Sequence, residues 1–267
     1  MMDESAPRNY LITAASGIGA ATARMLAAAN PKSIQLFLVA REEQACSELA
    51  LELRSLGVLV EYRAGDLTDP EFAPLVVADC ASSFGRIDAL FNVAGISGRR
   101  FGDGPIHDCT EAGWSMTWNS NVTTQYRMCR EVVRLMLSQS LGANGQRGVI
   151  LNMASILGIN PEPKHFDTVA YATSKGAIIA MSRSIAASCS KNKIRVNAVA
   201  PGLVRTPMSA RASENPEIVN FMKTKQPLLE GMISVEDVAA ACVYLLTDSS
   251  RAVTGQVLVV DAGWNLS

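Results

Sequence analysis

The sequence has few of the residues that build metal sites and disulfide frameworks. It contains only two histidines, His107 and His165, and its six cysteines are scattered without a C-x-x-C pair. Such cysteine usage is typical of buried free thiols in a reducing compartment. A histidine-rich metal centre is not expected either. We therefore predict no metal site and a cytoplasmic protein.

Long apolar runs and a strong net charge are also lacking. No apolar run approaches the length of a membrane span, and the N-terminal stretch MMDESAPRNY has acids and no apolar core, unlike a secretory signal. The formal net charge of −1 gives no reason to expect nucleic acid or an acidic membrane as a partner. We predict that neither is bound.

The chain shows no internal repeat, low-complexity tract or linker that would divide it. Its 267 residues are 48% hydrophobic and 18% charged, a balance typical of a globular protein with a substantial core. We predict one domain spanning residues 1–267, with a substrate segment near residues 207–231 that is polar, helical and mobile.

Apolar runs of strand length alternate with helical patterns throughout. The expected strands cover residues 9–14, 34–39, 58–62, 87–93, 149–153, 194–199 and 256–260. The expected helices cover residues 20–29, 43–56, 110–139, 171–190 and 235–246, and one more follows Asp69-Pro70-Glu71, with Asp69 as its N-cap and Pro70 in the first position. This pattern predicts an α/β fold: a Rossmann-type, doubly wound parallel sheet of about seven strands with helices on both faces, in a single domain.

The irregular stretches after the first, fourth, fifth and sixth expected strands would meet at the carboxyl edge of such a sheet, where ligands bind. The first is the turn Thr13-Ala-Ala-Ser-Gly-Ile-Gly19. Glycines there let a pyrophosphate approach the backbone amides at a helix N-terminus. The turn is closer to a G-x-x-x-G-x-G form than to G-x-G-x-x-G, with Ala14 taken as its first glycine, although only two residues separate Ala14 from Gly17. An ordinary strand-to-helix turn is the alternative.

The residue after the second expected strand indicates which nucleotide would fit. A carboxylate there accepts the ribose 2′-hydroxyl of NAD, whereas an arginine suits the 2′-phosphate of NADP. This chain has Ala40-Arg41, which favours NADP(H), with NAD(H) as the less favoured choice. In the alternative, Arg41 is a surface residue paired with Glu42 or Glu43.

Tyr171 and Lys175 lie four residues apart in a helical, alanine-rich run, so both side chains leave the same helix face. A nearby ammonium lowers the pKa of a phenol, and such a phenol can exchange a proton with a reacting oxygen. Taken alone, the pair favours the alternative of a chance arrangement on a solvated helix face, and only the rest of the chain can reverse this.

The ordered set of motifs resembles the short-chain dehydrogenase/reductase family, of the short, single-domain branch, over essentially the whole chain. The matching elements are the turn at 13–19, Gly65-Asp-Leu67, Asn92-Val-Ala-Gly95, Asn119-Ser-Asn-Val122, Met153-Ala-Ser-Ile-Leu-Gly158, Tyr171-Ala-Thr-Ser-Lys175 and Pro201-Gly-Leu-Val-Arg-Thr206, with a late Thr254-Gly-Gln and Asp261-Ala-Gly. The chain departs from the family pattern at Ala14 and in a slightly longer stretch between Ser155 and Tyr171.

The resemblance implies an NADP(H)-dependent oxidoreductase that interconverts a carbonyl and a secondary alcohol. It assigns Tyr171 as general acid or base, Lys175 to the nicotinamide ribose, Ser155 to the substrate oxygen, and Asn121 to a helix break and a water linked to Lys175. The resemblance also implies these cofactor-binding residues: Thr13, Ser16, Gly17, Ile18, Gly19, Arg41, Asp66, Leu67, Asn92, Ala94, Gly95, Tyr171, Lys175, Pro201, Gly202, Val204 and Thr206.

The substrate is expected to be a small molecule held by residues 96–109, 158–168 and 207–231. The mixture of apolar and basic side chains in these segments is compatible with sugars, steroids, acyl thioesters or small ketones. The side chains are Arg99, Arg100, Phe101, Lys164, Phe166 and Phe221. By resemblance, a homodimer or homotetramer is expected. The competing hypothesis is a nucleotide-sensing binding protein of the same fold without catalysis.

Overall fold

Seven parallel strands form one sheet in the order β3-β2-β1-β4-β5-β6-β7. The computed structural model describes residues 7–267, so the first six residues weighed above as a leader lie outside the described part. The strands are β1 (Arg8–Ile12), β2 (Ile34–Ala40), β3 (Leu59–Ala64), β4 (Ala89–Asn92), β5 (Gly148–Met153), β6 (Ile194–Pro201) and β7 (Val257–Val260). All seven strands coincide with the expected ones to within a few residues.

The strands inside the sheet, β1, β2, β4, β5 and β6, bury side chains on both faces, because successive residues point to opposite sides of a sheet, whereas the edge strands β3 and β7 are mostly half-buried. In β1, Tyr10 and Ile12 join one core cluster, whereas Leu11 between them joins the other. In β2, Phe37 faces the second cluster and its two neighbours face the first. This two-sided burial explains why the strands are continuous apolar runs.

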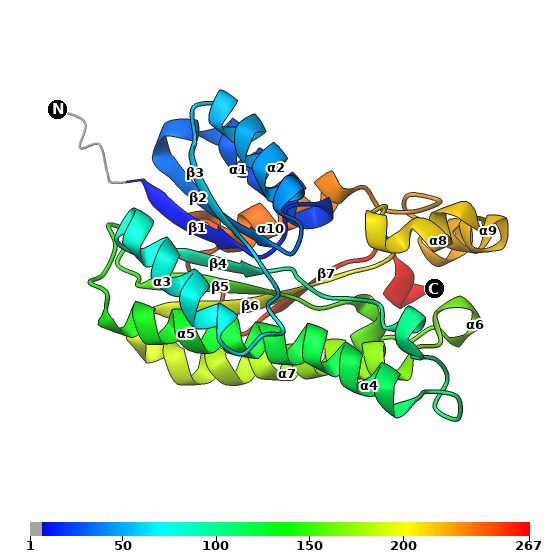
Figure 1. The fold of residues 1–267 in the computed structure, drawn as a ribbon. Coiled ribbons are helices and arrows are strands. Elements are labelled where there is room, and N and C mark those ends of the chain that lie inside the picture. Colours follow the sequence, from blue (N-terminus) through cyan, green and yellow to red (C-terminus); the bar gives the residue numbers. More distant parts are fainter. Residues whose placement is uncertain (1–6) are drawn as a thin grey trace.

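Helices cover both faces of the sheet (Figure 1). On one side lie α1 (Gly17–Ala29), α2 (Glu43–Ser55) and α10 (Val235–Leu246), whose buried residues pack in the first cluster. On the other lie α3 (Phe72–Phe84), α5 (Thr124–Ser138) and α7 (Val169–Cys189), which pack in the second cluster, and α4 (Glu111–Trp118), which contacts α7. The predicted Rossmann-type, doubly wound α/β sheet is confirmed.

Two local predictions need correction. The helix expected from Asp69 begins at Phe72, because Asp69 accepts the amide of Glu71 through its side chain and forms a separate turn, and Pro70 lies outside the helix. The helix expected over residues 110–139 is divided into α4 and α5 by a π-helical segment, Asn119–Thr123. Such π-bulges occur frequently at functional sites.

Two of the three segments expected to hold the substrate fold into short helices beyond the carboxyl ends of the strands (Figure 1). The stretch after β5 contains α6 (Pro163–Phe166), and the stretch after β6 contains α8 (Ala210–Glu214) and α9 (Pro216–Lys225). From β1 the chain adds β2 and β3 on one side of the sheet, and from β4 onward it adds strands on the other side. Sheets of this kind bind ligands at such a switch point, here between β1 and β4. Within residues 7–267, no helix is long and apolar enough to span a bilayer.

Candidate active site

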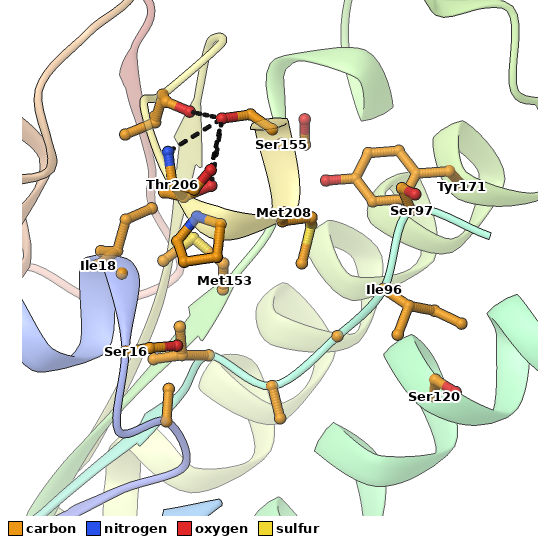
Figure 2. Close-up of a pocket in the computed structure, with 18 of the residues that line it drawn as sticks. Ser16, Ile18, Ile96, Ser97, Ser120, Met153, Ser155, Tyr171, Thr206 and Met208 are labelled. Carbon is orange, nitrogen blue, oxygen red and sulfur yellow. Dashed lines mark hydrogen bonds between the residues drawn. The ribbon is translucent and has the colours of Figure 1, made fainter. Parts of the chain in front are cut away.

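A cavity of about 460 Å³ lies at the carboxyl edge of the sheet. Its lining comes from the segments that follow each strand from β1 to β6, as the strand order predicts. Figure 2 shows Ser16 and Ile18 on one side of this space, with Ser155 and the Tyr171 ring on the other. Turns at the start of the fold and side chains from its middle therefore face one cavity.

The turn after β1 presents the start of α1 to the cavity. Gly17 is the first helical residue and has a φ of +53°, a conformation that favours glycine. The N-cap residue Ser16 makes no side-chain capping bond, and the first turn of α1 carries no acid. Backbone N–H groups at a helix N-terminus attract anions, and here they lie in the cavity lining with Ser16, Gly17 and Ile18.

Gly19 has a role that depends on the unusual residue Ala14. A methyl group on Gly19 would lie 2.6 Å from the Ala14 Cβ and 3.0 Å from the Ala14 carbonyl oxygen. Gly19 therefore allows α1 to pack against the end of β1, and it does not line the cavity. Gly19 thus leaves the room that Ala14 occupies in this turn.

Arg41 follows β2 directly and lines the same end of the cavity. Within residues 7–267 it forms no ion pair with Glu42, Glu43 or any other carboxylate, so the surface-pair alternative is not supported. Asp66 and Leu67 line this end as well, and the Asp66 carboxylate accepts hydrogen bonds from the amide and hydroxyl of Thr68.

The ends of β1 and β4 are joined by the side chain of Thr13. Its hydroxyl accepts the amides of Val93 at 2.9 Å and Ala94 at 3.3 Å, which closes the crevice floor at the switch point. Thr13, Ala94 and Gly95 line the cavity, but Asn92 does not. Instead, its buried amide nitrogen donates to the side-chain oxygen of Asn152, so Asn92 joins β4 to β5 and does not face the cavity.

Ser155 and Tyr171 meet at the other end of the cavity. Ser155 follows β5, and Tyr171 lies in the first turn of α7. The Ser155 hydroxyl acts to lower the pKa of Tyr171, but burial has the larger effect and raises that pKa above its usual value. Lys175 is not among the causes of this shift, so its expected lowering of the phenol pKa stays a prediction for the protein with bound nucleotide.

Lys175 lies one turn farther along α7, with its ammonium 5.5 Å from the centre of the Tyr171 ring. The ammonium donates to the carbonyl oxygen of Met153 at 2.9 Å, and only 3% of the residue is exposed. Burial lowers the pKa of Lys175 to about 7. The spacing placed both residues on one helix face correctly, and the structure adds that this face is buried and lines the cavity.

Asn121 lies in the π-helical segment that separates α4 from α5, which bears out the expected interruption of the helix. Its side-chain oxygen accepts the amide of Ile96 at 2.7 Å, and its nitrogen donates to the Ile96 carbonyl and to the hydroxyl of Ser174. Asn121 does not line the cavity. Its side chain joins the loop after β4 to the helix that carries Tyr171 and Lys175.

Asp103 was not recognised in the sequence as a site residue. It is 6% exposed, and its two carboxylate oxygens accept the amides of Ala170 at 3.0 Å and Tyr171 at 2.9 Å. The N-cap residue of α7, Thr168, makes no side-chain capping bond, so Asp103 caps this helix from another loop. The only signal in the sequence is an acid between Gly102 and Gly104, which does not reveal its partner.

The loop after β6 completes the cavity, and all four residues expected there line it: Pro201, Gly202, Val204 and Thr206. The hydroxyl of Ser209 accepts the Thr206 amide and donates to the Val204 carbonyl, which fixes this loop.

The six side chains expected near the substrate divide between cavity and surroundings. Arg99 and Phe166 line the cavity, whereas Arg100, Phe101, Lys164 and Phe221 do not. A further arginine that the sequence did not indicate, Arg211 of α8, lines it too.

A family profile described as Enoyl-(Acyl carrier protein) reductase matches residues 13–265, which include every element of the cavity. The chain belongs to the short-chain dehydrogenase/reductase family. This is a family of oxidoreductases, and the resemblance drawn from the motifs is confirmed.

Curated relatives of this family match over most of the chain. The protein named Dehydrogenase/reductase SDR family member 6 from Rattus norvegicus is 32% identical over 264 residues, covering 96% of this chain and 96% of that protein. A galactitol 2-dehydrogenase from Rhizobium johnstonii is 32% identical over 230 residues, covering 85% and 84%.

Among solved structures, a variant of actinorhodin polyketide ketoreductase with NADPH has a TM-score of 0.85 at 27% identity, with 98% of both chains covered. The similarity extends over the whole fold.

Proposed function

We propose that the protein is an NADP(H)-dependent oxidoreductase that interconverts a carbonyl and a secondary alcohol on a small molecule. The observation that carries the proposal is that Ser155, Tyr171 and Lys175 line the same cavity as the unpaired Arg41. One end thus offers a proton donor and a hydroxyl, and the other offers a cation for a phosphate.

The residues present fit a dinucleotide. The uncapped N-terminus of α1 offers N–H groups to a pyrophosphate, and Arg41 offers a fork of donors to a 2′-phosphate. Asp66 and Leu67 would border the adenine, Lys175 the nicotinamide ribose and Thr206 the carboxamide. The bound nucleotide supplies the hydride.

The protein's own residues would govern the proton. Because burial raises the pKa of Tyr171, the phenol is protonated at neutral pH and is ready to donate to a carbonyl oxygen during reduction. Ser155 would hold that oxygen where negative charge develops. The π-helical segment at Asn121 keeps the α7 face in place through Ser174.

The decisive experiment replaces Tyr171 with phenylalanine, which removes the proton donor and little else. We expect NADPH affinity to stay near the wild-type value and turnover of every accepted carbonyl to fall by at least ~100-fold. Turnover is followed by the loss of NADPH absorbance, and affinity by fluorescence titration. Near wild-type turnover in this variant would refute the assigned chemistry.

The second candidate function is a nucleotide sensor of the same fold that performs no catalysis. The intact Ser155, Tyr171 and Lys175 argue against it, because a sensor needs none of them. A panel of ketones and alcohols assayed with NADP(H) and NAD(H) separates the two functions. Tight nucleotide binding with no hydride transfer across the panel would favour the sensor.

We also propose a homodimer or homotetramer in a reducing, cytoplasmic compartment. Support for assembly comes from the family and from large side chains left partly exposed on α4 and α5, Trp118 and Tyr126. Support for the compartment comes from the six free cysteines, five of which are buried. Sedimentation of the purified protein tests the assembly.

A further inference from the structure

Two arginines line the cavity beyond Tyr171, and they come from different loops. Arg99 follows β4, and Arg211 lies in α8, which follows β6. They lie close enough that the charge of Arg211 adds to burial in lowering the pKa of Arg99, against the opposing effects of Asp103 and Asp167. Two like charges are thus held at one end of a cavity.

Neither guanidinium has a carboxylate partner in residues 7–267. Arg99 donates one hydrogen bond, to the carbonyl oxygen of His165 at 3.0 Å, and Arg211 donates none to the described residues. The nearby Asp103 is already occupied by two backbone amides of α7. A structural role, in which Arg99 holds the loop at His165, would explain its single hydrogen bond, but the same explanation does not apply to Arg211.

The charges around the cavity are distributed unevenly. Its two lining carboxylates, Glu42 and Asp66, follow β2 and β3 at the end where Arg41 lies. The end with Tyr171 has only cations among its charged lining residues, namely Arg99, Arg211 and Lys175. Such a site attracts an anion and repels a cation.

The same end also has an apolar wall, formed by Leu157, Phe166, Met208 and Trp264. The rings of Phe166 and Trp264 lie 5.5 Å apart, which gives part of this wall a fixed shape. A ligand that fits both features has an apolar body and one anionic group.

We infer that the substrate carries an anionic group, a carboxylate or a phosphate, which Arg99 and Arg211 bind while its carbonyl faces Ser155 and Tyr171. The inference rests on the proposed function for the carbonyl. The anion is unchanged in the reaction: the carbonyl carbon gains a hydride from the reduced nucleotide, and its oxygen gains a proton from Tyr171. Guanidinium groups suit both anions, because their parallel donors match two oxygens.

Matched substrates test the inference. Levulinate and homologous oxo-carboxylates with one to four methylene groups between ketone and carboxylate are compared with their methyl esters, and dihydroxyacetone phosphate is compared with dihydroxyacetone. We expect at least one anion to have a kcat/KM roughly 10- to 100-fold above its neutral partner, the range for a hydrogen bond to a charged group. The preferred pair identifies carboxylate or phosphate. Equal kcat/KM values within every pair would overturn the inference and leave the proposed function standing.

Variants locate the preference. Arg211→Met and Arg99→Met should each remove most of the preference for the anion. Each should lower kcat/KM for the anionic substrate and leave kcat/KM for the neutral partner and NADPH affinity unchanged. Arg99→Lys should keep part of the preference. Arg100→Met is the matched control, because Arg100 is adjacent, exposed, stacked over Phe101 and outside the cavity lining. Arg211 makes no hydrogen bond or ion pair within residues 7–267, so we expect its variant to fold and to stay informative if Arg99→Met is unstable. An undiminished preference in Arg211→Met and Arg99→Met would overturn the assignment.

Binding provides a readout independent of turnover. In calorimetry with NADP⁺ present, hexanoate or hexyl phosphate should bind the wild type at least ~10-fold more tightly than hexanamide, and Arg211→Met should remove that difference. If these anions bind in this way but no carbonyl is reduced, the anion site stands and the redox function fails. If neither anion binds better than the amide, the anion site is refuted.

Discussion

The two ends of the cavity are built in different ways. The end near β2 and β3 consists of turns, backbone amides and exposed charges such as Arg41 and Asp66. The end near β5 and α7 consists of side chains removed from water, with Tyr171 and Lys175 held by packing and hydrogen bonds. The exposed end selects a ligand through charges that solvent still screens, whereas burial at the other end changes the pKa values of the reacting groups themselves.

Lys175→Met should have the largest effect on the buried end. We expect turnover to fall at least ~100-fold, because the variant removes the cation expected to hold the nicotinamide ribose and to support proton transfer. NADPH binding should weaken less, because Arg41 and the α1 N-terminus remain. Rapid-mixing measurements of turnover and fluorescence titration separate the two effects. Lys191→Met, at an exposed position, is the control.

The same variant should change how stability depends on pH. Burial lowers the pKa of Lys175 from 10.5 to about 7. Between these values the unfolded chain binds a proton that the folded chain does not, so the free energy of unfolding rises with pH by up to about 1.4 kcal/mol per unit. Below pH 7 the full cost of burying the ammonium remains. Denaturant unfolding of the protein without nucleotide, from pH 7 to 9, should show this rise in the wild type relative to Lys175→Met. Parallel curves would mean that Lys175 stays charged in the folded protein.

Arg41→Ala tests the exposed end. Loss of a guanidinium bound to a phosphate should weaken NADPH roughly 10- to 100-fold and change NADH affinity little. Fluorescence titration of both nucleotides gives the two affinities, and Arg205→Ala provides an exposed cation outside the cavity lining as control. If instead the wild type prefers NADH and Glu42→Gln removes that preference, then Glu42 and not Arg41 determines the nucleotide.

The sequence predicted most of the sheet, because strands buried on both faces are continuous apolar runs that local pattern detects. Tyr171 and Lys175 were paired correctly because both lie on one helix, where spacing determines geometry. Asp103 was missed because its partner Tyr171 lies 68 positions away, and only the packing of the loop against α7 joins them. The raised pKa of Tyr171 and the lowered pKa of Lys175 were not foreseen for a similar reason, since burial of a helix face depends on the whole fold.

The cap expected at Asp69 shows a limit of local motifs. An acid followed by proline is typical of a helix start, but here Asp69 forms its own turn and the helix begins at Phe72. The ring of Phe72 packs so closely beneath Gly65 that a methyl group there would lie 2.3 Å from it. We infer that this contact with the turn after β3 favours Phe72 as the start of the helix over the cap motif.

Gly19→Ala sharpens the description of the α1 turn. Its new methyl group would lie 2.6 Å from the Ala14 Cβ, so overpacking should cost about 1 to 3 kcal/mol and lower the melting temperature by several degrees. Combined with Gly19→Ala, Ala14→Gly should restore part of the lost stability. Alone, Ala14→Gly should not raise the stability of the wild type. Thermal melts of the four proteins form the cycle. Additive effects would show that Ala14 and Gly19 do not compete for the same space.

Asp103→Asn should have the smallest effect, and it tests whether the buried end depends on precise placement of Tyr171. The asparagine keeps one acceptor oxygen and loses the other, together with the negative charge at the start of α7. We therefore expect kcat to fall about 10-fold while the KM for NADPH is unchanged. Asp108→Asn, exposed in the same loop, is the control. A structural role alone would lower stability and leave kcat intact, whereas a positioning role lowers kcat at temperatures where the variant is fully folded. If kcat stayed at the wild-type value under those conditions, the α7 N-terminus would not need Asp103 to hold Tyr171 in place, and packing alone would position the phenol.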